Sequence, residues 1–121
     1  MHEYLRRRRR RRAETLARAS AALADLPTLG RHSREVSRFV VRALVDARAK
    51  VVEAHHLARR RSAARALLRE AYRWVDTWLR ARESGDVTAT QLVVLYGQLV
   101  WHLKHLARRL SVVARIDTYR L

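Results

Sequence analysis

Residues 88–110 read TATQLVVLYGQLVWHLKHLARRL. Thr88 followed by Gln91 is the pattern of a helix N-terminus. The threonine hydroxyl can accept a hydrogen bond from the backbone N–H of Gln91, while the glutamine side chain can accept one from the backbone N–H of Thr88. Leucines then recur at three- and four-residue spacing, which places them on one face of a helix. The stretch therefore predicts an amphipathic helix whose buried face is formed by Leu92, Leu95, Leu99, Leu103, Leu106 and Leu110.

The same helical period occurs in three earlier segments, which are separated by turn signals. The first covers about residues 2–25 and ends before Pro27, because proline disfavours a helical conformation at the preceding residue. The second begins at Ser33, a favourable N-cap, and the third begins after Ser62 and ends at Gly85, which supplies left-handed C-terminal geometry. The predicted buried faces are Leu16, Ala19, Leu23 and Leu26 in the first segment; Val36, Val40, Ala43, Ala47, Val51 and Ala54 in the second, widened by Phe39, Leu44, Val45 and Val52; and Ala64, Leu67, Leu68, Ala71, Val75, Trp78 and Leu79 in the third.

Short gaps between consecutive helices make neighbouring helices antiparallel. The predicted fold is therefore all-α, an antiparallel up-down-up-down four-helix bundle of residues 13–110. Residues 1–12 form a basic N-terminal extension that continues the first helix, and residues 111–121 form a frayed helical end or a C-terminal tail. A helical hairpin that pairs with a second copy of the chain is the alternative architecture.

The composition excludes several classes of protein. The chain has 121 residues and no cysteine, which removes disulfides, a thiol nucleophile and thiolate metal sites. One proline and three glycines supply few turns for an all-β fold. The longest uncharged stretch, residues 87–103, is shorter than the about 20 apolar residues that a bilayer span requires. We therefore expect a soluble, cytoplasmic protein with no membrane partner.

The charge of the chain indicates a polyanionic partner. The sequence has 27 Lys+Arg against 11 Asp+Glu, a formal net charge of +16, and 25 of the basic residues are arginine. Arginine presents a planar fork that fits phosphate oxygens, whereas lysine presents a point charge. Residues 31–82 alone contain fourteen basic and five acidic residues. The basicity therefore belongs to the predicted bundle as well as to the arginine run at residues 6–12.

Arginines repeat at four-residue spacing in two segments. One stripe is Arg34, Arg38 and Arg42, and the other is Arg65, Arg69 and Arg73. This spacing places the members of each stripe on one face of their helix. A solvated face of a basic protein is the alternative to a phosphate contact, and the repetition of the pattern in two segments favours the contact. The run at residues 6–12 is either a disordered basic tail or a helix with phosphate contacts; the helical spacing of Glu3 with Arg7 and of Arg10 with Glu14 favours the helix. The predicted nucleic-acid-binding residues are Arg6, Arg7, Arg8, Arg9, Arg10, Arg11, Arg12, Arg34, Arg38, Arg42, Arg65, Arg69 and Arg73.

The uncharged residues 87–103 contain more apolar side chains than one buried face requires. Val93, Val100 and Trp101 lie off the leucine face. Small bundles seldom bury a helix on all sides, so these three residues are predicted to form an interface between subunits. A helix that lies unusually deep in the monomer core is the alternative.

The sequence contains no recognisable catalytic or metal-binding pattern. His102 and His105 are three residues apart, but the inward glutamates that accompany such pairs in di-metal bundles are absent nearby. The three glycines are isolated, so no phosphate-binding loop is present. We expect no enzymatic activity, no metal and no cofactor, and we interpret the histidines as structural or RNA-stacking residues.

Three local features resemble the accessory variability determinant (Avd) family of diversity-generating retroelements. They are the turn from Pro27 to Gly30, Arg31 and His32; the aromatic third helix with Tyr72, Trp74 and Trp78; and the entry to the last helix at residues 88–91. The resemblance covers about residues 13–110. This family belongs to a wider four-helix-bundle family that includes the intervening-sequence proteins encoded within bacterial large ribosomal RNA genes.

The resemblance implies a ring-like homopentamer with no catalytic residues. It also implies association with the retroelement reverse transcriptase and with its template RNA or cDNA, in the error-prone copying known as mutagenic retrohoming. Two alternatives remain open at this level. One is a ribosomal intervening-sequence protein of unknown role, and the other is a structural assembly protein whose arginine faces bind acidic protein partners.

Overall fold

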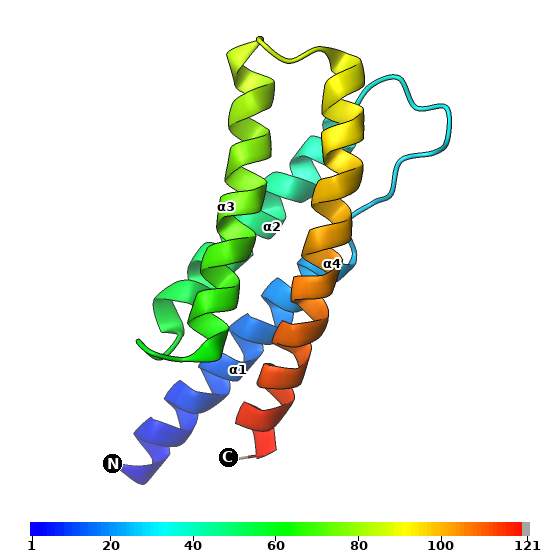
Figure 1. Ribbon diagram of the computed structural model, residues 1–121. Helices are drawn as coiled ribbons and strands as arrows, with labels where there is room; N and C mark the ends of the chain where they lie inside the picture. The colour runs from blue at the N-terminus through cyan, green and yellow to red at the C-terminus, as the bar shows by residue number, and fades with distance from the viewer. Residues whose placement is uncertain (120–121) are drawn as a thin grey trace.

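The computed structural model describes residues 1–119 along the backbone and residues 1–116 in their side chains. Over this range the chain forms four helices and no strand: α1 (His2–Ala24), α2 (Arg38–Leu57), α3 (Ala63–Ser84) and α4 (Ala89–Tyr119). Consecutive helices run in opposite directions (Figure 1). The predicted all-α class is confirmed, and the arrangement is compatible with a four-helix bundle.

Each helix packs against two others. α1 and α3 both contact α2 and α4. The contact between α1 and α4 brings the first and last helices of the chain together. α4 is the longest helix; its first half lies beside α3 and its second half beside α1 (Figure 1). Within the described part of the chain, no helix is long and apolar enough to cross a membrane.

Hydrogen bonds confirm the predicted starts of α3 and α4, and the left-handed conformation of Gly85 confirms the predicted end of α3. The Ser62 hydroxyl accepts from the backbone N–H of Arg65 at 3.2 Å and caps α3, which ends at Gly85 with a left-handed φ of 72°. At the start of α4 the Gln91 N–H donates to Thr88 Oγ1 at 3.2 Å, and the Thr88 N–H donates to Gln91 Oε1 at 2.9 Å. These ends were predictable because the capping residues bond within three positions of themselves.

The predicted start of α2 is wrong by one turn. Ser33 donates its N–H to the Gly30 carbonyl at 3.1 Å in a turn, and the N-cap is Ser37, whose hydroxyl accepts from the Val40 N–H at 3.4 Å. Val40 is the first buried residue of this segment, so packing selects the later of two similar capping serines. Arg34 consequently lies in the loop before α2 and not on its face.

The core contains the predicted faces of α1 and α3 in full and those of α2 and α4 in part. On α2, Leu44 is buried, but Phe39, Val45 and Val52 are exposed instead of widening the buried face. On α4, the predicted core residue Leu95 is 40% exposed, whereas the next residue, Tyr96, is buried. The Tyr96 hydroxyl donates to the Pro27 carbonyl at 2.5 Å and so fixes the α1–α2 loop against α4. The buried apolar residues are Ala13, Leu16, Ala19, Leu23, Leu26, Val40, Leu44, Ala47, Val51, Ala54, Ala64, Leu67, Leu68, Ala71, Val75, Trp78, Leu79, Tyr96, Leu99, Val100, Leu103, Leu106, Ala107, Leu110 and Ala114.

Both ends of the described chain are helical. The arginine run lies within α1, as the helical interpretation predicts. α4 continues to Tyr119, which agrees with a helical end after residue 110 and not with a tail that begins at residue 111. Leu110 and Ala114 remain buried there, and Ser20 of α1 donates to the Ala107 carbonyl at 2.8 Å, so packing against α1 stabilises the extra turns. Residues 120 and 121 of the predicted tail lie outside the described residues.

Candidate nucleic-acid interface

The predicted arginines of α2 and α3 form two exposed groups. Arg38 and Arg42 are exposed on the first turns of α2, and Arg69 and Arg73 are exposed on α3. Arg65 is half-buried, and one of its guanidinium nitrogens donates to the Ala58 carbonyl at 3.5 Å. Arg34 is exposed in the preceding loop, so the structure separates it from the helical group with which its spacing had placed it.

An ion pair between α2 and α3 fixes how these groups lie along the bundle. Arg48 of α2 contacts Asp76 of α3 at 3.1 Å. Arg42 lies six residues before Arg48, and Arg69 lies seven residues before Asp76 on the antiparallel helix. At 1.5 Å per helical residue the two arginine groups are therefore about 20 Å apart along the bundle axis. They therefore form two separate groups in place of one continuous face.

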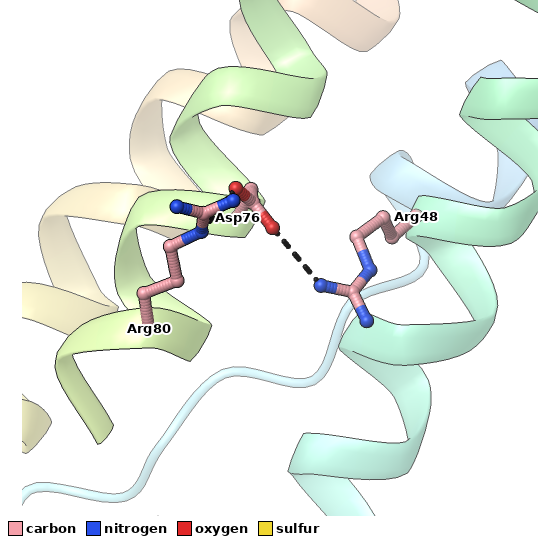
Figure 2. A network of polar contacts seen from close by, with 3 residues as sticks. All are labelled: Arg48, Asp76 and Arg80. Carbon is pink, nitrogen blue, oxygen red and sulfur yellow. Dashed lines mark hydrogen bonds and ion pairs between the residues drawn. The ribbon is translucent and has the colours of Figure 1, made fainter. Parts of the chain in front are cut away.

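Acidic side chains neutralise some basic residues of α2 and α3 and leave other basic residues without an acidic partner. Asp76 also contacts Arg80 at 2.9 Å, so one carboxylate holds two guanidinium groups (Figure 2). Asp46 similarly holds Lys50 at 2.9 Å. Among the described residues, the other exposed arginines of these helices have no acidic group within ion-pair distance; they include Arg38, Arg42, Arg69 and Arg73. These side chains are available to an external anion.

A hollow of about 320 Å³ lies between α2 and α3 beside the second arginine group. Val51, Val52, His55, Arg69 and Tyr72 line it. Burial lowers the pKa of His55 below its ordinary value of 6.5, and the positive charges of Arg65 and Arg69, followed by His56, lower that pKa further. The pKa of His55 therefore depends on the charge around Arg65 and Arg69, and an anion bound to these arginines would raise that pKa again.

The arginine run surrounds the first half of α1 with positive charge. Residues 6–11 are exposed, and Arg12 is half-buried where α1 joins the bundle. Glu3 pairs with Arg7 at 3.3 Å, as its spacing predicts, but Glu14 contacts Arg18 at 3.8 Å in place of Arg10. Like charges three and four residues apart repel by a few tenths of a kcal/mol per pair. A phosphate backbone would relieve this repulsion, which makes the segment a suitable anion-binding element.

The three residues predicted to form a subunit interface lie in different environments. Val100 is 5% exposed and belongs to the core, so its prediction as an interface residue is wrong; Val93 is half-buried; and Trp101 is 60% exposed. Val100 is buried because α4 contacts both α3 and α1, which widens its buried arc beyond one leucine stripe. Among the described side chains of α4, the large apolar ones that remain exposed are Val94, Leu95, Trp101, Val112 and Ile116.

The histidines of α4 contact aromatic rings. The His102 ring stacks on Trp74 of α3 with ring centroids 4.2 Å apart and planes 17° apart. Trp101 lies edge-on to His102 at 5.0 Å and in tilted contact with His105 at 4.1 Å. The Trp101–His105 pair could have been found from its four-residue spacing, whereas the contact with Trp74 joins two helices and has no local signal.

Among the described residues, no group of three or more histidine, aspartate and glutamate side chains is arranged to hold a metal ion. No protein-family model matches this chain, and neither a curated protein nor a solved structure matches it. The candidate site is therefore defined by its own residues, namely the arginine groups of α2 and α3 and the arginine run of α1.

Proposed function

We propose that this protein is a non-enzymatic nucleic-acid-binding accessory subunit that holds phosphate backbones with exposed arginines. The observation that supports the proposal is the set of exposed arginines without an acidic partner on α2 and α3, in a chain of formal net charge +16. Arginine binds phosphate oxygens through two parallel hydrogen bonds, and such contacts supply most sequence-independent affinity for nucleic acids.

The shape of the surface favours contact with the backbone over reading of base sequence. Bases in a duplex are reached by a helix or ribbon that enters a groove. The arginines of α2 and α3 instead lie along the side of a pair of helices, in two groups about 20 Å apart along the axis. This spacing suits contacts with separate phosphates along one strand or across a groove.

The resemblance noted above extends the proposal to the biological role. On that basis the protein works with a retroelement reverse transcriptase and its template RNA or cDNA in mutagenic retrohoming, and it acts as a ring-like homopentamer. The arginine run of α1 and the exposed Val94 and Leu95 of α4 provide two chemically different surfaces for such an assembly.

Binding of unrelated RNA and DNA sequences, measured by fluorescence anisotropy over a salt series, tests the proposal. The variant Arg38→Gln/Arg42→Gln should weaken binding about equally for all sequences and reduce the slope of log K against log[salt] by about 1.4–1.8, or 0.7–0.9 per lost phosphate contact. The control Arg18→Gln/Lys50→Gln removes the same charge from residues that already pair with Glu14 and Asp46. It should change the slope less.

Three results would contradict the proposal. Equal effects of the two double variants would show that only net charge matters. A loss confined to one sequence, with the salt slope unchanged, would indicate base reading. Binding to polyglutamate without binding to RNA or DNA would favour the structural protein that recognises acidic partners.

A further inference from the structure

Four aromatic rings form a cluster on the outer surface of α3 and α4. We call this set, Trp74, Trp101, His102 and His105, the ring cluster. Each ring contacts at least one other within 5.0 Å between centroids, and the contacts run without a break from Trp74 through His102 and Trp101 to His105. The cluster is thus a connected aromatic surface built from two helices.

The ring cluster is not required to fill the core. Trp101 is 60% exposed and Trp74 is 37% exposed, whereas Trp78 is buried and donates its indole N–H to the Leu92 carbonyl at 3.1 Å. Burial of Trp78 satisfies both its apolar ring and its polar atom. Trp101 leaves most of a large apolar ring in contact with water, which is a cost that a binding partner would remove.

The charges around the ring cluster are mainly positive. Arg108 and Arg109 follow His105 by three and four residues on α4, which places them one turn away on the adjoining surface. Both are exposed, and among the described residues neither has an acidic group within ion-pair distance. Asp76, two residues after Trp74, is paired with Arg48 and Arg80, and Glu70 lies one turn before Trp74 on α3. A ligand that fits here combines flat apolar faces with negative charge.

We propose that the ring cluster binds unpaired bases of a single-stranded nucleic acid by stacking, while Arg108 and Arg109 contact its phosphates. This inference rests on the proposed function and adds to it a preference for single strands. Bases expose their π-faces only when they are unpaired, and stacking on aromatic side chains tolerates any base. The arginines of α2 and α3 hold the backbone elsewhere on the molecule.

A second copy of the chain suits this surface less well. Two copies that paired through the ring cluster would bring together two chains of formal net charge +16, with Arg108 and Arg109 of each copy beside the interface. Like charges at an interface disfavour association. A single strand meets the same arginines with opposite charge.

The test measures binding of three probes: an oligothymidylate, a duplex of the same length, and heparin, a polyanion without bases. Trp101→Ala should lower affinity for the oligothymidylate by about 5- to 160-fold, the range expected for loss of one stacked base. Affinity for heparin and the salt slope should be unchanged, because no phosphate contact is removed. Trp101→Phe should restore most of the affinity, and wild-type tryptophan fluorescence should be quenched by the oligothymidylate but not by heparin.

Val112→Ala provides the matched control, because Val112 is 52% exposed on the same helix and lies outside the ring cluster. It should bind all three probes like the wild type. Unchanged oligothymidylate affinity in Trp101→Ala, or an equal loss for heparin, would overturn the inference while leaving the proposed function intact. So would a fall in the sedimentation mass of the free Trp101→Ala protein that accounts for its loss of binding, since the face would then join two copies. A wild-type protein that binds none of the probes would refute the proposed function itself.

Discussion

Replacing Asp76 with asparagine should lower the free energy of unfolding and raise the affinity for polyanions. Its carboxylate joins Arg48 of α2 to α3, with exposed side-chain fractions of only 32% for Arg48 and 17% for Asp76, and it also holds Arg80, which is 78% exposed. A charge-assisted hydrogen bond in the first environment contributes about 1.5 kcal/mol, and the exposed pair adds about 0.4 kcal/mol. The free energy of unfolding should therefore fall by about 2 kcal/mol, which lowers Tm by roughly 8 °C for a chain of this size.

The same substitution releases two arginines toward the arginine groups of α2 and α3. The slope of log K against log[salt] for RNA should become steeper by up to about 1.4–1.8 if both guanidinium groups then meet phosphates. Thermal unfolding followed by circular dichroism and anisotropy over a salt series give the two readouts. Asp46→Asn is the matched control: it makes the same charge change at a carboxylate that is 61% exposed and pairs with Lys50, so it should cost only about 0.4 kcal/mol. If both variants lose the same stability, the reasoning about the Asp76 pairs is refuted.

Three further outcomes follow from the core and from the α2–α3 hollow. Val100→Glu should prevent stable folding, because it places a charge at a position that is 5% exposed, whereas Val94→Glu, at 58% exposure, should remain helical; circular dichroism distinguishes them. Tyr96→Phe should lower the free energy of unfolding by about 1–2 kcal/mol in urea titrations, because a loop carbonyl loses its donor. The lowered pKa of His55 means that the unfolded chain binds its proton more readily, so stability should be full above pH 6.5 and decrease as the pH falls below it; in NMR titrations Arg69→Gln should raise that pKa toward 6.5.

Helix ends were predictable from sequence where the capping bonds are local and only one candidate exists. Ser62 and Thr88 satisfy both conditions. The start of α2 offers two serines four residues apart, and the choice of Ser37 over Ser33 depends on where the first valine reaches the core. That information is tertiary, and it moved Arg34 from a helix face into a loop.

The width of a buried face was harder to predict than its existence. Every predicted core residue of α3 is buried, because that pattern has a clear apolar side. On α4 nearly every side is apolar through residue 103, so periodicity does not distinguish Tyr96 and Val100, which are buried, from Leu95, which is 40% exposed. Contacts with both α1 and α3 decide the matter.

The candidate site was predictable as a set of arginines but not as an arrangement. Four-residue spacing identified the exposed Arg38, Arg42, Arg69 and Arg73. It did not show that Asp76 also neutralises Arg48, because that pair joins two helices. The distance between the arginine groups likewise depends on the register of α2 against α3.

The packing of α1 against α4 also determines when the fold can be completed during synthesis. The contact between Ser20 and Ala107 spans 87 residues, and at roughly 5–20 residues per second a ribosome needs about 4–17 s to make that intervening chain. Contacts between α2 and α3 are closer in sequence and can form meanwhile, since local pairings carry a smaller loop-closure cost. During that interval the apolar face of α1 lacks its last partner while its arginines are already exposed, so the proposed binding of a polyanion can begin before the core has closed.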